Sequence, residues 1–78
     1  MQQTTLWIDH EESGLYFDFY ELCLHHLDAE TGVLALGFRG GLYHEVTDPV
    51  VAQGLSGVLK EIRASIVAQQ TSPILRPN

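Results

Sequence analysis

An Asp-Pro pair, Asp48 and Pro49, divides this chain into two parts with different periodicities. Aspartate is a favoured N-cap residue, and proline is well tolerated at the first helical position, where no backbone N–H is needed. After the pair, apolar residues recur every three or four positions, at Val51, Leu55, Val58, Leu59, Ile62 and Ile66. That spacing places them on one face of a helix. We therefore predict an amphipathic helix over residues 48–70.

The residues before this pair form apolar runs separated by polar segments that contain glycine. The runs cover residues 4–9, 15–27, 33–39 and 42–46. Aromatic and β-branched residues are typical of strands, and glycine supplies the positive φ that tight turns need. We therefore expect an α+β fold, with a three- or four-stranded antiparallel β-meander packed on one C-terminal α-helix. Residues 1–70 are expected to form this single domain.

The long run at 15–27 also admits a helical interpretation, because Tyr16, Tyr20, Cys23 and Leu27 recur at helical spacing. Pairing with the run at 33–39 favours a strand. If the indices of opposed residues add up to an even number, one face collects Tyr20, Leu22, Leu24, Leu34, Leu36 and Phe38. A sum of 60 or of 62 satisfies this condition, whereas an odd sum divides these six residues between the two faces of the sheet. We therefore predict that this face is the core and that Leu24→Asp unfolds the domain.

The odd-numbered residues of the same run form a second face that is too apolar for a solvated surface. They are Phe17, Phe19, Glu21, Cys23, His25 and Leu27, and Trp7 of the first run lies on the same side. Two explanations stay open. A homodimer mate or a target protein covers this face, or a β-bulge near residues 16–20 reverses the alternation and buries Phe17 and Phe19 in the core.

Charge is distributed unevenly along the chain, whose formal net charge is −6. Residues 1–48 carry nine acids and one base, a net charge of −8, and residues 49–78 carry three bases and one acid, a net charge of +2. An acidic surface repels phosphate, so we expect no direct nucleic-acid binding. Two explanations of this acidity stay open: it keeps a small protein soluble, or it forms an acidic face that engages a basic protein partner. The predicted binding residues are an aromatic centre with an acidic rim: Trp7, Phe17, Phe19, Glu11, Glu12 and Glu21.

Four histidines and a single cysteine raise the question of a metal or thiol site. These residues are His10, His25, His26, His44 and Cys23. They lack the spacing of zinc ligands, and no base and orienting group accompany the thiol. We therefore expect no cofactor and no catalytic residues. A small metal- or thiol-dependent enzyme that uses Cys23 and the histidines is the competing hypothesis.

The sequence thus indicates a small acidic protein–protein interaction or regulatory module that self-associates through an aromatic sheet face. A more specific alternative is a phage-type inhibitor of a host nucleic-acid enzyme, whose acids imitate a phosphate backbone. No apolar run reaches the roughly 18 residues of a membrane span, and the N-terminus lacks the form of a signal peptide. We therefore expect a cytoplasmic protein without membrane contact.

Two further expectations concern the C-terminal part. Gly54 and Gly57 lie three residues apart near the apolar stripe, and this placement predicts a close helix–sheet or helix–helix approach. Residues 71–78 contain two prolines and show no periodicity, so they are expected to form a flexible tail.

Overall fold

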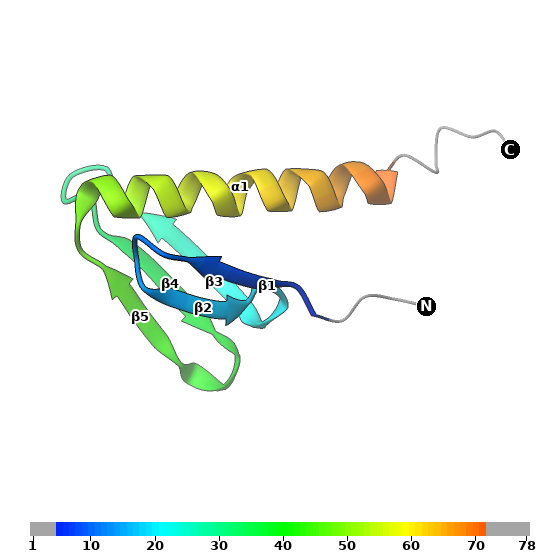
Figure 1. Ribbon diagram of the computed structural model, residues 1–78, viewed down its shortest axis with the longest axis horizontal. Helices are drawn as coiled ribbons and strands as arrows, with labels where there is room; N and C mark the ends of the chain where they lie inside the picture. Colours follow the sequence, from blue (N-terminus) through cyan, green and yellow to red (C-terminus); the bar gives the residue numbers. More distant parts are fainter. Residues whose placement is uncertain (1–4, 72–78) are drawn as a thin grey trace, which may run out of the picture.

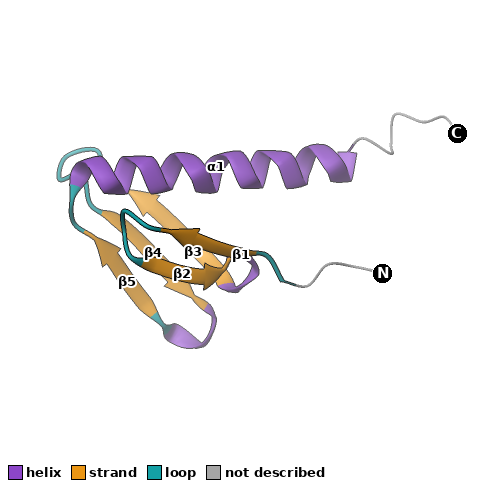
Figure 2. Cartoon of the chain, viewed as in Figure 1, coloured by secondary structure: helices purple, strands orange, loops and turns teal. Residues whose placement is uncertain are grey.

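The computed structural model describes residues 5–71, and within them the chain forms five strands, two short 3-10 turns and one long helix (Figures 1 and 2). The strands are β1 (Trp7–His10), β2 (Leu15–Asp18), β3 (Leu22–Leu27), β4 (Leu34–Phe38) and β5 (Tyr43–Val46), and the helix is α1 (Pro49–Thr71). β1 and β2 form an antiparallel hairpin, and β3, β4 and β5 form an antiparallel meander. The predicted α+β class, with an antiparallel meander on one C-terminal helix, is confirmed.

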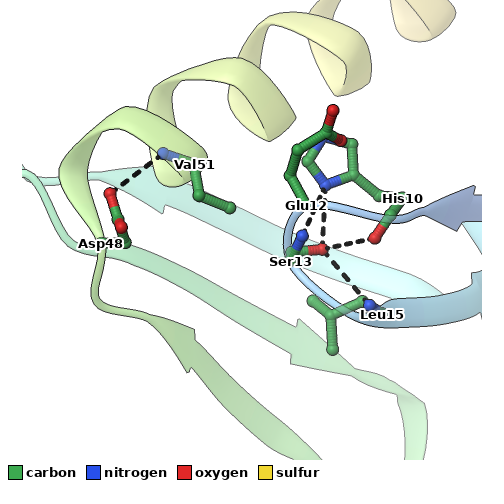
Figure 3. Close-up of polar contacts among 6 residues, drawn as sticks. All are labelled: His10, Glu12, Ser13, Leu15, Asp48 and Val51. Carbon is green, nitrogen blue, oxygen red and sulfur yellow. Dashed lines mark hydrogen bonds and ion pairs between the residues drawn. The ribbon is translucent and has the colours of Figure 1, made fainter.

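The start of α1 follows the local chemistry of its first residues. Asp48 Oδ1 accepts hydrogen bonds from the backbone N–H groups of Val50, at 3.0 Å, and Val51, at 3.3 Å; the second is drawn in Figure 3. Two N–H groups of the first turn are thereby satisfied, as expected of an N-cap. The helix runs one residue beyond the predicted range, to Thr71, and the rest of the predicted flexible tail lies outside the described residues.

The core forms where α1 and the β1–β2 hairpin share one face of the three-stranded sheet. Figure 1 shows the hairpin crossing that sheet alongside α1, whose C-terminal half extends past the strands. The ring of Phe17 in β2 packs edge-on against that of Phe38 in β4, with centroids 5.3 Å apart. The buried apolar residues come from all three parts: Ile8, Phe17, Leu34, Leu36, Val46, Ala52, Leu55 and Leu59.

The prediction of one continuous strand over residues 15–27 is wrong. β2 ends at Asp18, and a 3-10 turn, η1 (Phe19–Glu21), carries the chain from the hairpin into the other sheet. Asp18 Oδ1 accepts hydrogen bonds from the N–H of Tyr20, at 3.0 Å, and of Leu6, at 2.8 Å. This carboxylate therefore caps the turn and ties it to the residue before β1.

The predicted register between the second and third runs is correct only at its first pair. Leu22 lies opposite Phe38, an index sum of 60, but a bulge follows and Leu24 lies opposite Gly37, a sum of 61. The extra residue reverses the alternation of side chains along β3. Leu24 is consequently 61% exposed, so its predicted place in the core is wrong. His25, opposite buried Leu36, takes the inward position instead.

The predicted role of the two helix glycines is also wrong. A Cβ atom built on Gly54 or on Gly57 meets no other atom within 4 Å, so neither glycine permits a close approach among the described residues. Both are exposed. The position that packs tightly on the sheet is Ala52, which is fully buried, whereas Val58 of the predicted stripe is 37% exposed.

The inward placement of His25 makes the stability of the fold dependent on pH. Burial, together with the positive charges of Arg63 and Lys60, lowers the pKa of His25 below its ordinary value of 6.5. The unfolded chain therefore takes up this proton before the folded chain does. Above about pH 6.5 the imidazole is neutral in both the folded and the unfolded chain. The free energy of unfolding decreases as the pH falls below this value.

We expect urea unfolding midpoints to decrease between about pH 7.5 and about pH 5. His25→Asn is expected to flatten this decrease, because it removes the group that must be protonated against burial and two positive charges. His26→Asn is the matched control, since His26 is the exposed neighbour that points to the opposite face of β3. An equal pH slope in the His25 variant and the wild type would show that His25 does not carry the effect.

Candidate functional site: an aromatic groove beside β2

The β1–β2 hairpin separates its aromatic residues between two faces. Ile8 lies opposite Phe17, and both are buried against the sheet. Trp7 and Tyr16 occupy the other face, where their rings stack with centroids 4.9 Å apart and an interplanar angle of 18°. The two side chains are 56% and 65% exposed. The hairpin therefore presents a preformed aromatic pair to solvent.

A groove of about 460 Å³ lies beside this pair, between β2 and the region where β4 leads into β5. Phe17 and Phe38 line its deeper part, where their edge-on contact closes it off from the core. Leu42, which is 68% exposed, lines the side opposite the hairpin. Tyr43 also adjoins the groove, but its ring lies on the outer face of the three-stranded sheet, where it bonds Glu45. This volume falls in the range of ligand sites, and the lining is mainly apolar and aromatic.

The charged residues at the groove are two acids and one base. Glu21 and Arg39 form an exposed ion pair, with Oε1 and Nε 4.0 Å apart. Such a pair adds little to stability, so both groups are available to a ligand. Asp18 also lines the groove, but it is only 6% exposed and its Oδ1 is occupied by two backbone N–H groups.

Three of the six predicted binding residues, Trp7, Phe17 and Glu21, line this groove. Their settings differ, because Phe17 is buried within the chain whereas Trp7 and Glu21 are exposed. Phe19 is half-buried and packs against the core. The sequence left two explanations open for Phe17 and Phe19: cover by another protein, or burial in the core. The structure places both residues at the core. The irregularity responsible is the 3-10 turn at residues 19–21, which separates Phe17 in β2 from Leu22 in β3.

The other two predicted residues, Glu11 and Glu12, lie in the turn between β1 and β2 and do not line the groove (Figure 3). Ser13 orders this turn, because its hydroxyl donates to the His10 carbonyl at 3.1 Å and accepts from Leu15 N–H at 3.3 Å. Nε2 of His10 lies 3.5 Å from Oε1 of Glu12. Both glutamates are exposed, and Glu12 lines a separate pocket with Asp48 and Val51 at the start of α1.

Several acids have structural roles that reduce the charge available for recognition. Asp18, Asp28 and Asp48 each accept hydrogen bonds from two backbone N–H groups. At Asp28 the bonds from Glu30 and Thr31 lower the pKa of the carboxyl. Only the role of Asp48 was predictable, since a proline and a helical stripe follow it.

The groups considered for metal or thiol chemistry do not converge. Within residues 5–71, no three of the His, Cys, Asp and Glu side chains are arranged to hold a metal ion. Cys23 is exposed at the bulge of β3, and its Sγ lies 3.9 Å from the backbone carbonyl of Glu21. In the same described range, no helix is both long and apolar enough to cross a membrane.

Sequence reasoning missed most of the groove's lining, including its exposed residues Tyr16 and Leu42. Tyr16 was placed inside a long strand, and Leu42 follows the Gly40-Gly41 pair without a motif. The phenol of Tyr43 donates a 2.6 Å hydrogen bond to Oε2 of Glu45, and this bond raises the pKa of Tyr43.

No family model, curated protein or solved structure matches this chain.

Proposed function

We propose that this protein is a small protein-binding module and that the groove beside β2 receives a segment of a basic partner protein. The carrying observation is the exposed Trp7–Tyr16 stack beside an apolar depression that exposed Leu42 lines on its other side. Tryptophan and tyrosine are enriched at the centres of protein interfaces, where a few of them carry most of the binding energy. An exposed aromatic cluster of this kind is uncommon on a surface without a partner.

Charge supports a basic partner over an acidic one. The exposed charges of the groove, Glu21 and Arg39, offset each other, because the third charged residue, Asp18, is buried and capped. The whole chain adds a field from a formal charge of −6. Fields of this sign accelerate the association of cationic partners and lose strength as salt is added. Imitation of a phosphate backbone is less favoured, because three of the nine acids in residues 1–48 cap backbone N–H groups.

Selection from a random-peptide display library tests this function. We expect the enriched peptides to combine apolar residues with lysine or arginine. Trp7→Ser is expected to weaken their binding, measured by calorimetry, by about tenfold or more, as is typical of an aromatic hot spot. Leu24→Ser is the matched control, since Leu24 is equally exposed but lies away from the groove, and it is expected to change affinity less than about twofold.

Two other results would contradict the proposal that the groove binds a basic partner. Peptides that bind wild type and Trp7→Ser equally well would exclude the groove as the docking site. A second copy of this chain is the alternative occupant, corresponding to the homodimer expected from the sequence. Sedimentation at twice the chain mass, reduced to one chain mass by Trp7→Ser with Tyr16→Ser, would identify a second copy in place of a basic partner.

A further inference from the structure

The groove runs along a strand edge that has no neighbouring strand. β2 pairs with β1 alone, so its other edge is open within residues 5–71. The bond from Phe19 N–H to the Leu6 carbonyl, at 2.7 Å, sets which residues face β1. In an antiparallel pair every second residue turns its backbone groups to the partner strand, so Phe17 faces β1 whereas Tyr16 and Asp18 face away. The N–H and C=O of Tyr16, which is 65% exposed, therefore point outward along the open edge, whereas Asp18 is 6% exposed and its C=O begins the turn η1.

This edge opens directly onto the apolar groove, since all four residues of β2 line it. A chain that paired with β2 would place every second side chain into the groove, against Phe38 and Leu42. The groove has room for apolar side chains at such alternate positions. Backbone pairing would supply affinity, and the groove would supply selectivity for apolar residues.

β2 lacks two of the devices that protect open strand edges against pairing, lysine and proline. Natural proteins blunt open edges with lysine, proline, bulges or inward-pointing charges. The four residues of β2 are Leu-Tyr-Phe-Asp, without proline or a cationic residue. The single charge, on Asp18, is buried and capped by two N–H groups, so it does not project along the edge.

We propose that the groove binds its partner by β-strand addition: an extended, basic segment with apolar residues at alternate positions pairs with the open edge of β2. This inference rests on the proposed function and names the partner segment and its mode of binding. The occupant is basic because the chain carries a formal net charge of −6, and nine of its ten acids lie in residues 1–48, which hold all the strands. It is extended because Tyr16 turns its N–H and C=O to the open edge, where a strand can pair with them.

Hexapeptides with alternating lysine and valine, blocked at both ends, are suitable probes. Trp7 is the only tryptophan, so its fluorescence reports on the groove directly. We expect saturable changes with the lysine–valine peptide and at least about tenfold weaker binding of a glutamate–valine peptide. N-methylation of the three valine amides removes the donors on one edge of the peptide, and methylation of the three lysine amides removes those on the other. One methylated form is expected to bind at least about tenfold more weakly, and the other within about twofold of the parent peptide.

Substitution at Tyr16 tests the same edge from the protein side. Tyr16→Pro removes an outward N–H that β1 does not use, and proline is tolerated on an edge strand. We expect Tyr16→Pro to bind the lysine–valine peptide about two- to tenfold more weakly than Tyr16→Ala, which loses the ring alone. If Tyr16→Pro does not fold, the methylated peptides still decide the matter on the wild-type protein.

The outcomes separate this inference from the proposed function. If both methylated peptides bind like the parent, strand addition is wrong but binding in the groove stands. If the lysine–valine peptide leaves Trp7 unaffected while library peptides bind in a Trp7-dependent way, strand addition is again wrong and the proposed function stands. If neither probe binds, both proposals fail.

Discussion

Leu36→Asp is expected to leave the chain unfolded at 25 °C. Leu36 is fully buried in the middle of β4, between α1 and the hairpin. The substitution forfeits about 1.5–3 kcal/mol of apolar burial and places a carboxylate where no partner awaits it, at a further cost of several kcal/mol. A domain of this size is stabilised by about 4–12 kcal/mol in total. Far-UV circular dichroism and a thermal melt measure the result.

Leu24→Asp is the matched control, and it is expected to melt within a few degrees of wild type. Leu24 is 61% exposed on the opposite face of the sheet, so the new carboxylate stays in water. The two variants together test the bulge in β3. If Leu24→Asp unfolds the chain as well, the odd register after the bulge is wrong and the even-sum register predicted from the sequence is restored.

Gly32→Ala is expected to destabilise the fold by about 2–5 kcal/mol. Gly32 ends the turn between β3 and β4 with φ of 76°, a region that costs an L-residue about 1–2 kcal/mol. A Cβ on Gly32 would also lie 2.8 Å from Cβ of Pro49, the first residue of α1. Relieving that overlap requires a backbone shift, at about 1–3 kcal/mol more. Urea unfolding at constant pH measures the difference.

Gly14→Ala isolates the conformational part of this effect. Gly14 has nearly the same φ, 74°, but a Cβ there meets nothing within 4 Å. We expect a loss of about 1–2 kcal/mol only. Equal losses at the two glycines would show that the β3–β4 turn does not press against the start of α1.

The parts of the fold that were predictable have local causes. The helix begins where an N-cap type is followed by proline, and Asp48 accepts the two expected hydrogen bonds. Gly32 has the positive φ predicted for its turn. These features depend on residues close together in the chain, so their interpretation needs no knowledge of tertiary packing.

The features of the fold that were predicted wrongly depend on contacts between distant segments of the chain. The turn at residues 19–21 forms because Asp18 binds both Tyr20 and Leu6, twelve residues back in the chain. The bulge in β3 has no marker such as glycine, yet it exchanges the roles of Leu24 and His25. A run that alternates perfectly in sequence thus divides between two sheets.

The groove illustrates the same limit. The sequence singled out Trp7 as an interface residue, and the structure places it at the groove. Phe17 was assigned to the same surface but is buried, and its place is taken by Tyr16, its neighbour on the other hairpin face. Leu42 lines the groove because the turn after β4 brings it back beside Phe38, whose N–H donates to the Leu42 carbonyl.

The central claim is that the groove beside β2 is the docking site, and amide chemical shifts during a titration test it most directly. The ¹⁵N-labelled protein is titrated with the lysine–valine hexapeptide. The largest saturable shifts are expected at Tyr16, Asp18, Phe38 and Leu42, which line the groove. Shifts concentrated on the opposite sheet face, at Leu24 and Ala35, or along α1 would contradict the claim.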